Sequence, residues 1–167
     1  MSQAATIIYL VRHAHAVAAP GEKRALSPQG RAGADHVAAL LRERPIVAIY
    51  SSPSRRVRQT LKPLAQALGL AIEERDELRE PGRGVPGAEA QHRAVALLTA
   101  LAQRHAGQQI AVGTHGNLLA LILQHYDPTL DAAVQQRLSL PDLYQLTPGE
   151  HPPITRLWDA GDRFATP

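Results

Sequence analysis

Residues 6–15 read TIIYLVRHAH and contain the pattern that organises the rest of the chain. Their first part, residues 6–11, is a run of β-branched and apolar side chains, which predicts a strand buried on both faces of a sheet. Arg12 and His13 follow at once, so a cation and an imidazole come at the carboxyl end of this strand. A charge in such a place is costly unless an anion faces it. The stretch therefore predicts a buried strand that ends in a polar, anion-binding site.

Short apolar runs and helix-length segments alternate through the remaining sequence. Ser27 and Pro28 have the pattern of a helix N-cap followed by proline at the first helical position, and Gly69 has that of a C-cap. The pattern predicts helices at about residues 28–42, 54–68, 88–105 and 117–125, and further strands at about 46–50, 70–72, 109–112, 143–146 and 154–158. Such alternation predicts an α/β fold, a three-layer α/β/α sandwich with a mainly parallel sheet. Because no linker or repeat is visible in the 167 residues, we expect one domain over residues 1–167.

The composition excludes several classes of protein and of site. The chain has no cysteine, which excludes disulfides, thiolate metal sites and a cysteine nucleophile. Aromatic residues are only 4%, too few for a surface that stacks bases, so we expect no nucleic-acid partner. No apolar run is long enough to span a membrane and no secretory signal begins the chain, so we expect a cytoplasmic protein without a membrane partner. Only Lys23 and Lys62 of the 18 basic residues are lysine, and arginine is the residue suited to bidentate contact with phosphate.

Polar residues recur where each predicted parallel strand ends. Ligands of α/β proteins bind beyond the carboxyl ends of the strands, so these residues are expected to meet. They are Arg12 and His13, then Ser51 and Ser52 with Arg55, Arg56 and Arg58, then the acids between residues 73 and 80, and GTHGN at residues 113–117. For Arg55 and Arg58 a solvated helix face is the favoured interpretation. Spacing alone does not select which arginine points inward.

A metal site at His13 and His15 is the main alternative for this edge. The two histidines are two positions apart on an extended segment, so both could face one side. No second metal-ligating cluster accompanies them, and the barrel hydrolases that use such a pair are longer than this chain. We therefore expect no metal and no other cofactor.

Four segments form a recognisable set of motifs in a fixed order. They are LVRHA at residues 10–14, SSPSRRVRQT at 51–60, LRE at 78–80 and THGN at 114–117, joined by LSPQG at 26–30. Together they resemble the histidine phosphatase superfamily, the phosphoglycerate-mutase-like proteins. The resemblance implies a phosphoglycerate-mutase-like fold. It also implies a metal-independent phosphohydrolase, a phosphomonoesterase that acts through a covalent phosphohistidine intermediate.

Residue roles follow from the same resemblance. His13 would be the nucleophile, Arg12 and Arg56 would hold the phosphoryl group, and His115 would be the second histidine, both catalytic and phosphate-binding. The two guanidinium groups should disfavour protonated His13 and so keep a nitrogen lone pair free for attack. Bidentate, charge-assisted bonds from the arginines to phosphoryl oxygens would supply the charge that other phosphatases take from a metal.

Glu80 stands where the family's proton donor falls, and Glu77 is the fallback. That role requires Glu80 to be neutral in the first step and ionised in the second. Further residues could line the pocket, and these are His15, Arg24, Thr114 and Asn117.

The short stretch between Glu80 and the helix expected at Ala88 predicts an open site. A mutase must shield its phosphohistidine from water, so an open site disfavours a mutase. The expected substrate is a phosphorylated small molecule or a phosphoprotein. Two alternatives stay open, a protein phosphohistidine phosphatase and a non-catalytic phosphate-binding member of the same fold.

Overall fold

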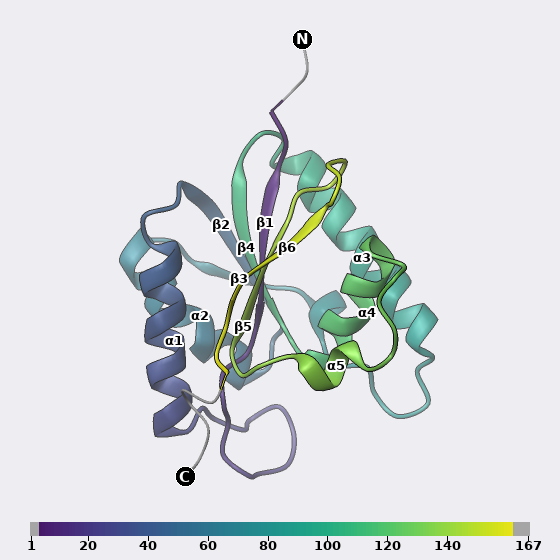
Figure 1. Cartoon of the computed structure of the whole chain (residues 1–167). Coiled ribbons are helices and arrows are strands. Elements are labelled where there is room, and N and C mark those ends of the chain that lie inside the picture. Colours follow the sequence, from purple (N-terminus) through teal and green to yellow (C-terminus); the bar gives the residue numbers. More distant parts are fainter. Residues whose placement is uncertain (1–3, 162–167) are drawn as a thin grey trace.

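One six-stranded sheet runs through the molecule (Figure 1). The computed structural model describes residues 4–161. Its strands are β1 (Ile7–Arg12), β2 (Ile46–Ser51), β3 (Ile72–Glu74), β4 (Gln109–Thr114), β5 (Asp142–Leu146) and β6 (Ile154–Asp159). They lie in the order β3-β2-β4-β1-β5-β6; the first four are parallel, β5 is antiparallel to β1, and β6 is antiparallel to β5. The mainly parallel sheet is therefore confirmed.

Helices cover both faces of this sheet. Helices α1 (Pro28–Leu41) and α2 (Arg55–Leu68) pack together on one face (Figure 1). On the other face lie α3 (Gly87–Arg104), α4 (Gly116–Tyr126) and the short α5 (Val134–Arg137). A single 3₁₀ turn, η1 (Asp76–Leu78), follows β3. These layers confirm the predicted α/β/α sandwich.

Alternate side chains of β1 enter two separate hydrophobic cores. Ile8 and Leu10 pack into the cluster under α3 and α4, whereas Tyr9 and Val11 pack into the cluster under α1 and α2. All four are completely buried. Successive strand residues point to opposite faces, so a strand covered on both sides is apolar throughout. This is the physical reason for the unbroken apolar run at the start of the chain.

Two local expectations are wrong. The third strand was expected at residues 70–72 and lies at Ile72–Glu74 instead. Gly69 has a positive φ of 66°, and the N–H of Leu70 donates to the carbonyl of Ala65. Leu70 is thus still part of the C-terminal cap of α2, and the strand begins two residues later than expected. No helical turn was expected between the third strand and the helix at residues 88–105, whereas η1 lies there.

The first turn of α1 closes the loop that follows β1. The Ser27 hydroxyl accepts from the N–H of Gly30 at 3.0 Å, which confirms the expected N-cap. A Cβ on Gly30 would lie 1.9 Å from the carbonyl oxygen of His15, so only glycine fits there. The LSPQG segment is therefore needed to fold this loop back against β1.

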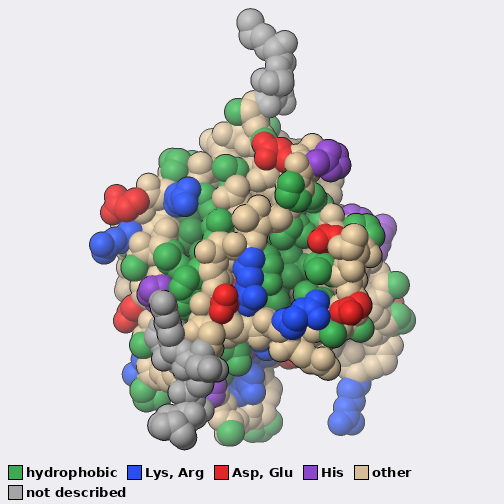
Figure 2. All heavy atoms as spheres, viewed as in Figure 1, with side chains coloured by type: hydrophobic (Ala, Val, Ile, Leu, Met, Phe, Trp, Pro, Cys, Tyr) green, Lys and Arg blue, Asp and Glu red, His purple; other side chains and the backbone are tan. Residues whose placement is uncertain are grey.

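The sheet face at β5 and β6 shows hydrophobic side chains between scattered charges (Figure 2). Leu157 of β6 is one of the three large hydrophobic side chains that are exposed in the described part of the chain. Among residues 4–161, no helix has the length and hydropathy needed to cross a membrane.

Candidate functional site

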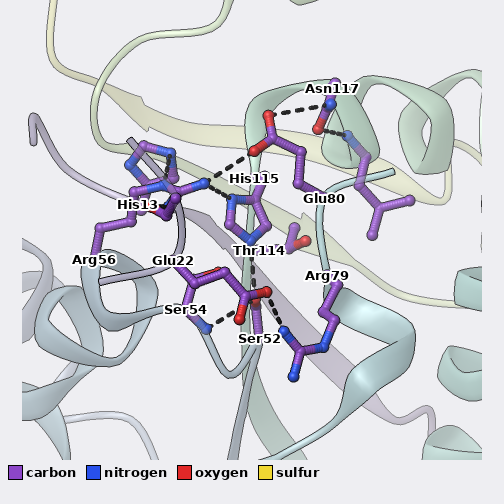
Figure 3. A network of polar contacts seen from close by, with 12 residues as sticks. His13, Glu22, Ser52, Ser54, Arg56, Arg79, Glu80, Thr114, His115 and Asn117 are labelled. Atoms are coloured by element: carbon purple, nitrogen blue, oxygen red, sulfur yellow. Dashed lines mark hydrogen bonds and ion pairs between the residues drawn. The ribbon is translucent and has the colours of Figure 1, made fainter. Parts of the chain in front are cut away.

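Arg56 lies at the centre of a polar network at the carboxyl ends of β1, β2 and β4 (Figure 3). Its side chain projects from the first turn of α2 and is almost fully buried. The Arg56 Nε–H points to His13 Nε2 at 3.3 Å. Nη2 lies 3.0 Å from both His115 Nδ1 and a carboxylate oxygen of Glu80. One guanidinium group thus contacts three of the predicted site residues.

His13 is held as a neutral imidazole with one bare nitrogen. Its Nδ1 lies 2.8 Å from the carbonyl oxygen of Ala14, which can only accept, so Nδ1 carries the proton in this bond. Nε2 is left with its lone pair directed at Arg56. Burial, and then the charges of Arg56 and Arg12, lower the pKa of His13 to about 3, although the Ala14 bond acts in the opposite direction. The direction agrees with the expectation, but burial rather than the arginines is the main cause.

His115 is neutral with the opposite tautomer. Because Arg56 donates to Nδ1, the proton lies on Nε2, which donates to the Ser52 hydroxyl at 2.8 Å. Burial, followed by proximity to His13 and Arg56, lowers the pKa of His115 to about 2. The two imidazole rings meet edge to face with centroids 5.5 Å apart. The site therefore places two uncharged imidazoles beside buried cations.

Arg12 is fixed by backbone groups from the far side of the sheet. Its Nη1 donates to the carbonyl oxygens of Leu138 and Ser139, at 2.9 and 3.3 Å. Its Nε is buried and has no partner among the described residues. A Cβ on Gly116 would lie 2.6–2.7 Å from the guanidinium group, so the absence of a side chain there makes room for Arg12. The glycine of the THGN segment is needed for this close approach.

Thr60 ties the loop after β1 to α2. Its hydroxyl accepts from the N–H of Ala14 at 2.9 Å and donates to the carbonyl of Arg56 at 2.7 Å. Thr60 thereby fixes Arg56 through its own backbone carbonyl and His13 through the backbone of the next residue, Ala14. Thr60 is completely buried, so neither bond competes with water.

Glu80 enters the network from the segment after η1. One carboxylate oxygen pairs with Arg56, and the other accepts from Asn117 Nδ2 at 3.3 Å. Its side chain is 52% exposed, so the carboxylate reaches solvent as well as the buried arginine. Glu77, the fallback acid, instead lies 3.7 Å from Arg75. Of the two acids, only Glu80 contacts the network.

A cavity of about 350 Å³ opens over this network and is lined by Arg56, Glu80 and Arg24, among others. Glu22 and Ser54 also line it. Arg24 has no polar side-chain partner within residues 4–161, and its Nε is buried. The cavity therefore contains a cation that pairs with no acid among residues 4–161. The arrangement can bind an anion at Arg56, whose guanidinium group also contacts the unprotonated Nε2 of His13; His13 itself does not line this cavity.

The sequence matches the profile of the histidine phosphatase superfamily (branch 1) over residues 8–85, a span that includes His13, Arg56 and Glu80. The matched residues, just under half of the chain, are similar to the histidine phosphatase superfamily. The matched span ends before β4, so the position of His115 rests on the structure. A search of curated proteins finds no match.

Solved structures share the fold over nearly the whole chain. Phosphoglycerate mutase from Bacillus anthracis str. Sterne has a TM-score of 0.78 at 14% identity, covering 97% of this chain and 96% of that one. A mycobacterial glucosyl-3-phosphoglycerate phosphatase has a TM-score of 0.74 at 19% identity, with coverages of 89% and 92%. Phosphoserine phosphatase from Entamoeba histolytica, solved with 3-phosphoglyceric acid, has a TM-score of 0.74 at 15% identity, with coverages of 92% and 95%. Phosphatases and a mutase thus share the architecture of this chain.

Two further predicted residues, His15 and Thr114, contact the segments next to the cavity from outside it. His15 Nδ1 lies 2.7 Å from the hydroxyl of Ser27, the N-cap of α1. The Thr114 hydroxyl donates to the carbonyl of Leu78 at 2.9 Å and so fixes the turn that leads to Glu80. Neither side chain lines the cavity. Within residues 4–161, no group of His, Cys, Asp or Glu side chains could hold a metal ion.

From the sequence, Ser52 was expected at this edge of the sheet without a role, and neither Thr60 nor Glu22 was singled out. Ser52 and Thr60 lie within the SSPSRRVRQT motif, which was the available signal for them. Glu22 pairs with Arg79 and joins the loop after β1 to the segment that carries Glu80. Nothing in its sequence surroundings distinguishes it from an ordinary surface acid.

Proposed function

We propose that this protein hydrolyses phosphate monoesters through a covalent phosphohistidine on His13. The observation that carries the proposal is the unprotonated Nε2 of His13, because the Ala14 carbonyl holds the proton of the ring on the other nitrogen. With a pKa of about 3, this ring stays neutral at all physiological pH values. A neutral imidazole with an oriented lone pair is a competent nucleophile.

Arg12 and Arg56 would bind the phosphoryl oxygens. The guanidinium group of Arg12 is fixed by backbone carbonyls, and that of Arg56 contacts both imidazoles. Charge-assisted hydrogen bonds of this kind contribute on the order of 1.5–3 kcal/mol each. Because these cations supply the positive charge that a phosphoryl transition state needs, the proposed reaction uses no metal ion.

The first step transfers the phosphoryl group to the enzyme. The lone pair of His13 Nε2 forms a bond to phosphorus, and the bond between phosphorus and the ester oxygen breaks. The leaving oxygen takes the proton of the Glu80 carboxylic acid. His13 becomes a phosphohistidine and keeps its Nδ1 proton, which stays hydrogen-bonded to the Ala14 carbonyl.

The second step returns the enzyme to its starting state. Water attacks phosphorus while the Glu80 carboxylate accepts the proton of that water, and the bond from phosphorus to Nε2 breaks. Inorganic phosphate leaves, His13 is neutral again and Glu80 is protonated. The electrons and protons balance without another reactant.

Substrate binding would itself prepare Glu80 as the acid. In the free site its carboxylate pairs with Arg56 at 3.0 Å. A bound phosphate dianion competes for the same guanidinium group and adds a second negative charge beside the carboxylate. Both changes favour the protonated form of Glu80, which is the form that can donate to the leaving oxygen.

Arg24 supports a substrate that carries a further anionic group. Its side chain lines the cavity with no acidic partner, and it adds to the charges that disfavour protonated His13 and His115. A carboxylate or a second phosphate near the ester would neutralise it.

The segment between Glu80 and α3 spans only residues 81–86. Of its residues, only Pro81 and Gly82 line the cavity. So short a cover leaves the phosphohistidine accessible to water, which supports hydrolysis rather than mutase activity.

Hydrolysis of an aryl phosphate in excess EDTA from pH 5 to 8 tests the proposal. Wild type, His13→Ala and His92→Ala are compared, since His92 is exposed on α3 and serves as the matched control. We expect turnover by wild type and His92→Ala, and none by His13→Ala. Activity that survives His13→Ala would show that the nucleophile is misassigned, and activity abolished by EDTA would contradict the metal-free mechanism. If every variant is inactive on the ester, the same comparison with a phosphohistidine-carrying protein separates a phosphoprotein phosphatase from a non-catalytic phosphate-binding protein.

A further inference from the structure

A larger cavity, of about 710 Å³, lies along α2 and has none of the site residues in its lining. It runs from Arg55 at the start of the helix to Gln66 near its end, and reaches the edge strand β3 at Ile72 and Glu74. We refer to it as the α2 groove. Arg56, the next residue after Arg55, lines the cavity of the site and not this one.

The α2 groove has an excess of positive charge. Its charged lining residues are Arg55, Arg58, Lys62 and Glu74. Glu74 is already paired with Arg58 at 3.2 Å. Arg55 and Lys62 are exposed and have no polar side-chain partner in the described part of the chain. They are seven residues apart, two helical turns or about 10 Å, and so lie on one face of α2.

The open edge of β3 forms the other side of the α2 groove. β3 ends the sheet and pairs only with β2. The N–H of Arg75 donates to the Ser51 carbonyl of β2 at 2.9 Å. Because backbone groups alternate in direction along a strand, those of Ile72 and Glu74 point away from β2, toward the open edge. The same two residues line the groove, so unpaired backbone groups and unpaired cations lie together.

The chemistry of the lining favours a polypeptide over a nucleic acid. The groove has apolar lining at Ala65, Leu70 and Ile72, and it contains no aromatic ring on which a base could stack. An edge strand with apolar and cationic neighbours can instead bind a peptide by adding it as a further strand.

We propose that the α2 groove binds an extended acidic segment of a partner protein. The segment pairs with β3 through its backbone and places carboxylates on Arg55 and Lys62. An extended chain advances about 3.3 Å per residue, so four to six residues, roughly, span the groove. This inference is independent of the proposed phosphatase activity, because it needs no phosphate and no residue of the site.

Fluorescence polarisation with a labelled hexapeptide of alternating glutamate and valine tests the proposal, and a peptide with glutamine in place of glutamate is the neutral probe. The proteins are wild type, Arg55→Glu/Lys62→Glu, and Arg42→Glu/Arg104→Glu. The last pair makes the same change in net charge on exposed residues that the groove does not contain. Thermal unfolding and aryl phosphate turnover verify that both double variants are folded. Backbone amide exchange of wild type with and without the acidic peptide reports on the edge of β3.

We expect the acidic peptide to bind wild type and the control pair with equal affinity, and the groove variant at least tenfold more weakly. The neutral peptide should bind wild type more weakly than the acidic one, and the amides of Ile72 and Glu74 should become protected. No binding, equal weakening in both double variants, or unchanged exchange at Ile72 and Glu74 would overturn the proposal. A single-stranded oligonucleotide that binds more tightly, with the same loss in the groove variant, would reassign the groove to nucleic acid.

Discussion

Gly116 is the position at which one added methyl group tests the geometry of the site. A Cβ there would lie 2.6 Å from Nε and 2.7 Å from Cζ and Nη2 of Arg12, whereas ordinary contact begins at 3.4 Å. In Gly116→Ala, Arg12 or the start of α4 must therefore move by about 0.8 Å. Arg12 cannot move freely, because Leu138 and Ser139 hold its Nη1. A shift of α4 would instead displace His115, the preceding residue.

The cost of that shift follows from the contact it removes. One charge-assisted hydrogen bond to the phosphoryl group contributes about 1.5–3 kcal/mol, which corresponds to a loss of roughly 10- to 150-fold in kcat/KM. Overpacking adds a loss of about 1–3 kcal/mol in the free energy of unfolding. We expect both losses in Gly116→Ala, measured by aryl phosphate turnover and by urea unfolding.

Gly87→Ala is the matched control. Its Cβ would lie at an ordinary 3.4 Å from the Leu121 side chain, and alanine favours the first turn of α3. We expect unchanged turnover and unchanged or higher stability. If Gly116→Ala is folded and retains full kcat/KM, then Arg12 does not bind the reacting group in the position that the structure gives it.

Further predictions concern single contacts of the site. Glu80→Gln removes the proton donor and the carboxylate that competes for Arg56, so kcat should fall about 10²- to 10⁴-fold while inorganic phosphate binds more tightly by calorimetry; weaker phosphate binding would contradict the competition. Thr60→Val leaves the buried N–H of Ala14 unpaired and should cost about 1–3 kcal/mol in urea unfolding, whereas the exposed Thr99→Val should change stability little. The pKa of His13 is lowered to about 3 and that of His115 to about 2, whereas both are near 6.5 in the unfolded chain. Between pH 6.5 and 3 the unfolded chain therefore binds protons that the folded chain does not. Stability should therefore fall as pH falls through this window, and His115→Gln should reduce the slope by about 1.4 kcal/mol per pH unit; an identical slope would show that His115 is protonated in the folded protein.

The fold could be predicted because its strands are covered on both faces. Such strands are apolar throughout, and the capping residues Ser27 and Gly69 marked where helices begin and end. The direction of the last two strands was not available from these signals, because apolar content and length are the same in parallel and antiparallel strands. The short helix α5 has four residues, too few to show a helical period.

The site could be predicted only in part, for a related reason. The motifs indicated His13, Arg56 and His115, and the structure places both histidines in contact with Arg56. The groups that fix Arg12 are backbone carbonyls at Leu138 and Ser139, and a carbonyl is the same in every residue type. Their position depends on the buried Asp142, which accepts from the Ser139 N–H and pairs with Arg156. Such support is set by tertiary structure, and a sequence pattern does not reveal it.

In the free site, Arg56 contacts both the proposed nucleophile His13 and the proposed acid Glu80. Arg56 donates to the same His13 nitrogen that would attack phosphorus, so the lone pair is hydrogen-bonded until another acceptor takes the guanidinium group. At 3.3 Å this bond is long and weak, and a doubly charged phosphoryl oxygen is the stronger acceptor. Entry of the phosphoryl group would therefore release both the His13 lone pair and the Glu80 carboxylate, because Arg56 holds both in the free site. One buried guanidinium group thereby couples the binding of the anion to the freeing of the nucleophile and of the acid.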